Sequence, residues 1–268
     1  MSIVADTLSL LLSSTLSVAA PAENGHGWLA QARSPLEIEV GGSVDRVSGD
    51  RSDWQEYWVL ARYRFGPRQS VSGRWLRAHR FDLTDTQGTL GVTFPVGDPW
   101  TVTLEGAMSP EHHFLPRWST MGHLHTNLGQ GWGVQVGAGI SEYGRVTPVS
   151  VTRQYATVER YFSAYRLAYT LSGTQVEDHR SGIGHQVAGS WYYMDGASVT
   201  LGVGTGQEVY AFPVGDETRV EVDRTNSAAI WGSHPIQAGL HLVYSFHGHQ
   251  QGDRFERTGA RVGFRQSF

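Results

Sequence analysis

The sequence contains no cysteine and no lysine. The absence of cysteine excludes a disulfide scaffold, a thiolate nucleophile and a cysteine-ligated metal centre. Charged residues make up only 17% of the chain, and the formal net charge is −4. Because nucleic-acid binding needs a basic surplus to contact phosphates, we expect no nucleic-acid partner.

Glycine and aromatic residues are abundant. The 268 residues include 33 glycines, 11% are aromatic and 40% are hydrophobic. This composition is too apolar for a disordered chain, and its mean hydropathy of −0.30 is too low for a helical membrane protein. We therefore expect one large all-β domain.

The N-terminal segment resembles an export signal. An apolar stretch from Ile3 to Val18 is followed by Ala20-Pro21-Ala22, which fits a small-residue cleavage site. We predict a signal peptide over residues 1–22, a linker over 23–34 and the main domain over 35–268. No later segment is long and apolar enough for a spanning helix, so a membrane protein would have to be a closed barrel.

Apolar and polar side chains alternate from Pro35 to the last residue. Leu36, Ile38 and Val40 fall on one face of the first segment, and Glu37 and Glu39 fall on the other. This period of two predicts β-strands. The longest apolar row runs from Ile236 to Phe246, where we expect a single strand.

Turn signals separate these segments into long strands. The strands are roughly ten to fourteen residues each, longer than the ~5–6 typical of soluble sheets and close to the ~9–11 needed to cross a bilayer. The count is about fourteen if residues 146–172 form two strands joined near Phe162, and about twelve otherwise. The turn signals are Ser48-Gly49-Asp50, Gly66-Pro67, Gly97-Asp98-Pro99, Asp195-Gly196 and Gln251-Gly252-Asp253.

Alternation alone fits both a soluble sandwich and a membrane barrel. The C-terminus favours the barrel, because an alternating strand that ends in Phe268 is typical of outer-membrane barrels. Aromatic residues also cluster near strand ends, as they do at membrane interfaces. These residues are Trp54, Tyr57, Phe65, Trp100, Trp118, Trp132, Tyr143, Trp191, Tyr193 and Trp231. We predict a single antiparallel up-and-down transmembrane β-barrel of about 12–14 strands, with the apolar face outward and a polar lumen.

Three stretches resemble the YaiO family of outer-membrane β-barrel proteins. They are residues 184–193 (GHQVAGSWYY), residues 199–208 (VTLGVGTGQE) and residues 261–268 (RVGFRQSF). The resemblance implies a barrel in the Gram-negative outer membrane, in a family often encoded near glycosyltransferase or exopolysaccharide genes. The resemblance predicts the location of the protein better than its molecular mechanism.

The expected partners follow from a barrel in that membrane. They are outer-membrane lipid and lipopolysaccharide, the barrel assembly machinery through the strand that ends in Phe268, and a polysaccharide. We expect a non-enzymatic role in the passage or anchoring of a glycan, an exopolysaccharide or another polar solute. The alternatives are a barrel enzyme acting on lipid, lipopolysaccharide or peptide, and a secreted carbohydrate-binding β-sandwich.

The polar rows supply the candidate site. Arginine forks bind carboxylates and sugar hydroxyls, and aromatic rings such as Trp58 and Tyr192 can stack on sugars. The same charges could instead pair with one another and plug the barrel. The predicted lumen-lining residues are Glu37, Glu39, Arg62, Arg64, Glu105, Arg166, Arg257, Arg261 and Arg265.

Catalytic and metal patterns are weak. Glu111-His112-His113 lies in a predicted loop and lacks a third ligand, and we expect a solvated loop. His185 and Ser190 differ in strand parity, so they should point to opposite faces of one strand. The remaining histidines with a possible role are His123, His125, His179 beside Asp178, His241, His247 and His249. We predict no catalytic residues, no metal and no cofactor.

Overall fold

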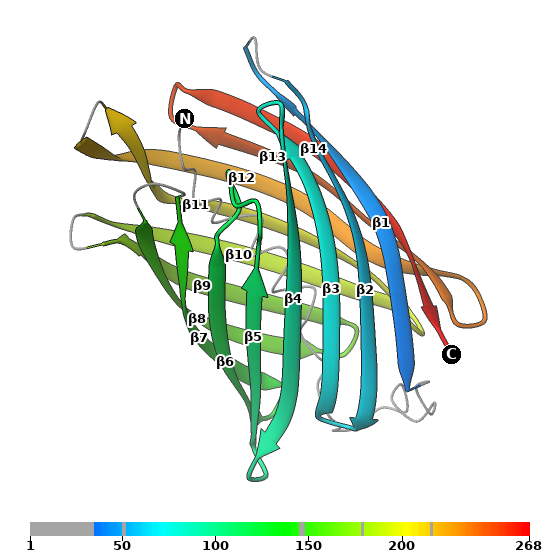
Figure 1. The fold of residues 1–268 in the computed structure, drawn as a ribbon. Coiled ribbons are helices and arrows are strands. Elements are labelled where there is room, and N and C mark those ends of the chain that lie inside the picture. Colours follow the sequence, from blue (N-terminus) through cyan, green and yellow to red (C-terminus); the bar gives the residue numbers. More distant parts are fainter. Residues whose placement is uncertain (1–34, 50–51, 145–147, 178–179, 215–216) are drawn as a thin grey trace.

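A computed structural model describes residues 35–49, 52–144, 148–177, 180–214 and 217–268. The predicted signal peptide and linker lie outside the described residues. Fourteen strands follow one another in the described part of the chain (Figure 1). They are β1 (Leu36–Val47), β2 (Trp54–Gly66), β3 (Gln69–Arg80), β4 (Leu83–Val96), β5 (Trp100–Met108), β6 (Trp118–Gly129), β7 (Trp132–Tyr143), β8 (Val149–Phe162), β9 (Tyr165–Val176), β10 (Arg180–Met194), β11 (Ala197–Val214), β12 (Glu217–Gln237), β13 (Leu240–Gln251) and β14 (Phe255–Ser267).

The strands close into a barrel. Each strand pairs antiparallel with its sequence neighbour, and β1 pairs with β14 in a register that places Val40 opposite Phe264. The first and last strands therefore lie side by side (Figure 1). The predicted all-β up-and-down barrel is confirmed, and the alternative of a two-sheet sandwich is wrong. In the described part of the chain, no helix has the length and hydropathy needed to cross a membrane.

Apolar side chains cover the outside of the barrel. Leu90, Leu104 and Leu201 are 72%, 48% and 61% exposed, whereas the charged Asp45 and Arg257 are 6% and 2% exposed. This is the reverse of a soluble protein, in which the large apolar side chains are buried. The apolar row of each strand thus faces outward and the polar row faces the lumen.

The two ends of the barrel differ. At one end, called the turn end, short connections such as 67–68, 130–131 and 195–196 join the strands. At the opposite end, called the loop end, the longest connection spans residues 109–117. Exposed aromatic residues at the turn end include Trp100, Trp132, Phe162, Tyr165 and Trp191, in the position of an interfacial belt.

Two details differ from the sequence prediction. Trp54, Tyr143 and Trp231 are buried rather than exposed in an aromatic belt, because they lie on the inward row of their strands. The apolar row from Ile236 to Phe246 is also not one strand. It is divided by a two-residue turn at 238–239, where Gly239 has a φ of 75° that other residues rarely adopt.

The outward row can be tested at the centre of β5. Leu104→Arg places a charge in hydrocarbon and should destabilise the folded barrel by about 2–4 kcal/mol. Thr103→Arg points into the lumen, where it loses one hydrogen bond to Thr93 and should cost about 1 kcal/mol. Urea unfolding in lipid vesicles measures both. Equal costs for the two variants would contradict the assignment of the faces.

Candidate functional site

Seven arginines line one side of the lumen. They come from the inward rows of β14, β2 and β3. These strands and β1, which lies between β14 and β2, also carry four inward carboxylates, Glu37, Glu39, Asp45 and Glu56. With histidine neutral, these seven arginines outnumber by three the inward carboxylates that the structure describes on these strands. We call it the arginine wall, and its arginines are Arg62, Arg64, Arg74, Arg80, Arg257, Arg261 and Arg265.

Two carboxylates near the turn end each serve two arginines. Glu37 lies 2.8 Å from Arg64 Nη2 and 3.9 Å from Arg62 Nη1. Glu39 Oε2 accepts hydrogen bonds from Nε and Nη2 of Arg265 at 3.1 and 2.9 Å. These ion pairs cross from β1 to β2 and from β1 to β14, so they connect neighbouring strands.

Trp58 organises the middle of the arginine wall. Its indole N–H donates to Glu39 Oε1 at 3.0 Å, and the guanidinium carbon of Arg261 lies 3.6 Å from the centre of its ring. A Cβ on Gly41 would overlap this ring, so glycine is required there. Because Trp58 is only 2% exposed, it cannot stack on a sugar, contrary to the sequence prediction.

Arg74 differs from its neighbours on the arginine wall. Arg80 binds Glu56 at 2.5 Å, whereas the described residues provide no hydrogen-bond partner for the buried Nε of Arg74 and no ion-pair partner for its side chain. Arg74 and Arg261 repel each other, and both attract Glu56. The middle of the wall therefore holds more cationic groups than its carboxylates neutralise.

On the opposite side of the lumen Glu159 is paired, whereas the buried Arg153 has two nitrogens, Nε and Nη2, with no hydrogen-bond partner among the described residues. Glu159 accepts from Arg166 Nε at 2.6 Å and lies 3.1 Å from His125 Nε2. Nearer the loop end, the Tyr155 hydroxyl accepts from Gln135 at 2.6 Å and contacts His123 Nδ1 at 2.6 Å. His123 Nε2 in turn lies 3.7 Å from Glu105.

Loop 109–117 is anchored to the barrel by a buried carboxylate. Asp85 is 0% exposed, and its two oxygens accept from the backbone N–H groups of His113, Phe114 and Leu115 at 3.0, 2.9 and 2.8 Å. The His113 ring contacts the same carboxylate at 2.7 Å. Asp85 thus anchors the backbone of this loop, while the side chains of Glu111, His112 and His113 stay partly exposed to solvent.

Glu111 provides a second anchor for this loop. Its carboxylate accepts from the amide and the hydroxyl of Thr86 at 3.0 and 2.7 Å. These hydrogen bonds favour the charged form and lower the pKa of Glu111. His112 instead contacts the Pro110 carbonyl oxygen at 2.8 Å, so these three adjacent residues point to different partners.

Two apolar clusters lie at the loop end of the barrel. One contains Val47 and Trp54, with Phe81 packed against them. The guanidinium carbon of Arg80 lies 4.5 Å from the Trp54 ring centre and 5.5 Å from that of Phe114. The other cluster reaches from β11 to strands β7, β8 and β9, and it contains Tyr143, Val149, Val151, Val176 and Val209. Both clusters therefore lie on the inward side of the barrel near the loop end.

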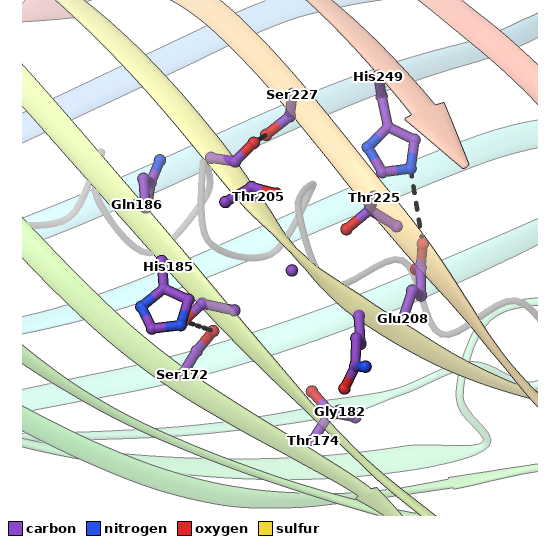
Figure 2. A pocket seen from close by; sticks show the side chains of 14 residues that line it. Ser172, Thr174, Gly182, His185, Gln186, Thr205, Glu208, Thr225, Ser227 and His249 are labelled. Atoms are coloured by element: carbon purple, nitrogen blue, oxygen red, sulfur yellow. Dashed lines mark hydrogen bonds and ion pairs between the residues drawn. The ribbon is translucent and has the colours of Figure 1, made fainter. Parts of the chain in front are cut away.

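A small polar pocket lies where β11 separates from β10 (Figure 2). The last pair between these strands is Gly184 and Gly206. His249 Nε2 lies 3.5 Å from Glu208 on one side, and Ser172 donates to the Gly184 carbonyl on the other. The glycines let the strands approach closely, because a Cβ on Gly206 would overlap the backbone of Gly184.

The possible catalytic residues do not assemble into one centre. His185 is exposed on the outer face and contacts the Tyr169 hydroxyl at 2.8 Å, whereas Ser190 is buried inside and accepts from Thr200. Their opposite directions confirm the parity argument. Asp178 and His179 lie outside the described residues.

The histidines of β13 are also separated. His247 pairs with Asp45 at 2.7 Å and His249 with Glu208, while His241 Nδ1 lies 3.4 Å from Ser233 Oγ. Within the described ranges, no group of three or more His, Asp or Glu side chains could hold a metal ion.

A closed, outwardly apolar barrel with a charged interior defines an outer-membrane β-barrel protein. The family described as the YaiO membrane beta barrel domain matches residues 36–211, and the chain belongs to this family. Since short turns face the periplasm in such barrels, the turn end is the periplasmic end and the loop end faces outward. No curated protein matches the sequence significantly.

Two solved structures share the fold. One is a "CymD monoaromatic hydrocarbon channel", with a TM-score of 0.62 and 10% identity, covering 93% of this chain and 94% of that chain. The other is a "Bacterial polysaccharide outer membrane secretin", with a TM-score of 0.58 and 10% identity, covering 89% of this chain and 100% of that chain. At this identity the likeness shows the fold alone.

The sequence reasoning missed Arg74, Arg80, Asp85 and Glu159. Arg74 and Arg80 share parity with Ser70 and Ser72 on β3, so the alternation that identified the other arginines could also have found them. Asp85 gave no such signal, because its role depends on a loop that returns to it from 28 to 30 residues away.

The anchoring of loop 109–117 can be tested with Asp85→Ala. This change leaves three backbone donors without their acceptor, which should destabilise the loop by about 2–3 kcal/mol and expose it to proteases. We expect trypsin to cleave the folded barrel after Arg117 roughly 30-fold faster. Asp53→Ala, at the same end of the barrel, is the control. Unchanged cleavage in Asp85→Ala would show that Asp85 does not hold the loop.

Proposed function

We propose that this protein is a non-enzymatic channel through which a glycan or a similar polar solute crosses the outer membrane. The charged and partly water-exposed interior carries this proposal, because a hydrated polar lumen can accept polar solutes. The side chains of Arg265, Arg62 and Glu105 keep 28%, 22% and 32% of their surface exposed, so water reaches them. Polar solutes can use the same space.

The structural neighbours support passage over catalysis. One is a channel and the other a polysaccharide secretin, and both share this barrel with the present chain. A barrel hydrolase would need a nucleophile, a base and an orienting group in contact. In the described chain, Ser233 and His241 come closest, but no carboxylate hydrogen bonds to His241.

The apolar clusters and loop 109–117 make the outer mouth the narrow point of the proposed channel. Solute would enter freely at the periplasmic end and pass outward only when the loop moves. Lipid and lipopolysaccharide would surround the outward apolar row. The strand that ends in Phe268 would be the segment bound by the assembly machinery, since it also forms the seam with β1.

Planar-bilayer recordings test this proposal. We expect small or rare current steps from the refolded protein and frequent, larger steps from Asp85→Ala, because the release of the loop widens the outer mouth. Asp53→Ala should behave like the unmodified protein. The absence of current from both the protein and Asp85→Ala, with folding verified by heat-modifiable gel migration, would refute passage and leave only anchoring.

A further inference from the structure

We propose that the arginine wall binds acidic saccharides, with the carboxylates of uronic acid units held between Arg74 and Arg261. This inference rests on the proposed function and names the chemical class of its solute. The proposed site is the middle of the arginine wall, farther from the turn end than the ion pairs that Glu37 forms.

The charge balance of the arginine wall supports an anionic ligand. Its seven arginines face four carboxylates, and two of these carboxylates are each shared by two arginines. Asp45 is engaged by His247 at 2.7 Å. An interior of reduced dielectric strengthens repulsion between like charges, so an excess of cations favours binding of an anion from solution.

Within the arginine wall, Arg74 is the group with the clearest capacity for a ligand. The described residues provide it with no ion-pair partner, and its Nε is buried without a hydrogen-bond acceptor. A buried guanidinium nitrogen that lacks an acceptor is costly, and a carboxylate oxygen would supply one. Because Arg74 belongs to the inward row of β3, such a ligand would lie in the lumen.

Arg261 is held in a position to bind the same carboxylate. Its plane lies over Trp58, and its Nη2 is 3.6 Å from Glu39 Oε1, beyond hydrogen-bond distance. The stronger contacts of Glu39 go to Arg265 and to the Trp58 indole, which leaves donors of Arg261 available. A guanidinium fixed by stacking loses little conformational entropy when it binds a carboxylate.

The opposite side of the lumen supplies uncharged partners beside charged ones such as Glu105. At a similar height in the barrel, β7 and β8 carry Gln135 and Tyr155, which form a hydrogen-bonded pair with His123. Amide and phenol groups bind sugar hydroxyls without adding charge. A saccharide in the lumen would thus meet mainly cations on one side, and on the other side neutral polar groups next to Glu105 and Arg153.

Equilibrium binding to the refolded, detergent-solubilised protein tests this inference. The probes are trigalacturonate, which carries carboxylates, and maltotriose, a neutral saccharide of equal length, both measured by isothermal titration calorimetry. We expect trigalacturonate to bind at least ten-fold more tightly than maltotriose. Arg74→Gln and Arg261→Gln should each weaken trigalacturonate binding by about ten-fold and leave maltotriose unaffected, because each removes one charged donor pair.

Arg77→Gln is the matched control, since Arg77 lies on the same strand but is exposed on the outer row. It should bind trigalacturonate as the unmodified protein does, and heat-modifiable migration verifies that every variant is folded. Equal affinity for the two saccharides, or equal loss in Arg77→Gln and Arg74→Gln, would overturn the inference. Neither of these binding results bears on bilayer current. The channel proposal is therefore tested separately, by the planar-bilayer recordings.

Discussion

The structure depends on one constraint: in hydrocarbon, every backbone N–H and C=O must be paired within the protein. The pairing of β1 with β14 meets this constraint by leaving no free sheet edge. Because strand side chains alternate, an apolar outer surface requires the other row to face a central space. The ionic residues therefore face the lumen because the barrel is closed, as much as because of any ligand. What decides their function is how completely they neutralise one another.

Neutralisation differs around the lumen. On the side of β8 and β9, Glu159 is matched by Arg166 and His125. On the side of β14, β1, β2 and β3, arginines outnumber carboxylates, and aromatic stacking replaces some of the missing ion pairs, as with Arg261 on Trp58. Stacking holds a guanidinium in position without neutralising it. Glu159 is thus satisfied internally, although Arg153 on β8 keeps two nitrogens without a partner in the described chain, and the arginine wall keeps charge that a solute can use.

The sequence predicts the barrel well, because its period of two, its strand lengths and its terminal Phe268 are local signals. It predicts the inward position of Glu37 and Arg62 for the same reason. It fails where the structure is non-local: the turn at Gly239 lies within an unbroken apolar row, and Asp85 acquires its partners only when loop 109–117 folds back. The burial of Trp54 and Tyr143 follows strand parity, which outweighs the tendency of aromatic residues near strand ends to face the interface.

The ion pair between Glu39 and Arg265 joins residues 226 positions apart. Contacts of such long range carry a large loop-closure entropy and form late in folding. This pair cannot form until the last strand pairs with the first, so it forms only when the barrel closes. The ion pair therefore stabilises the completed ring and no single hairpin within it.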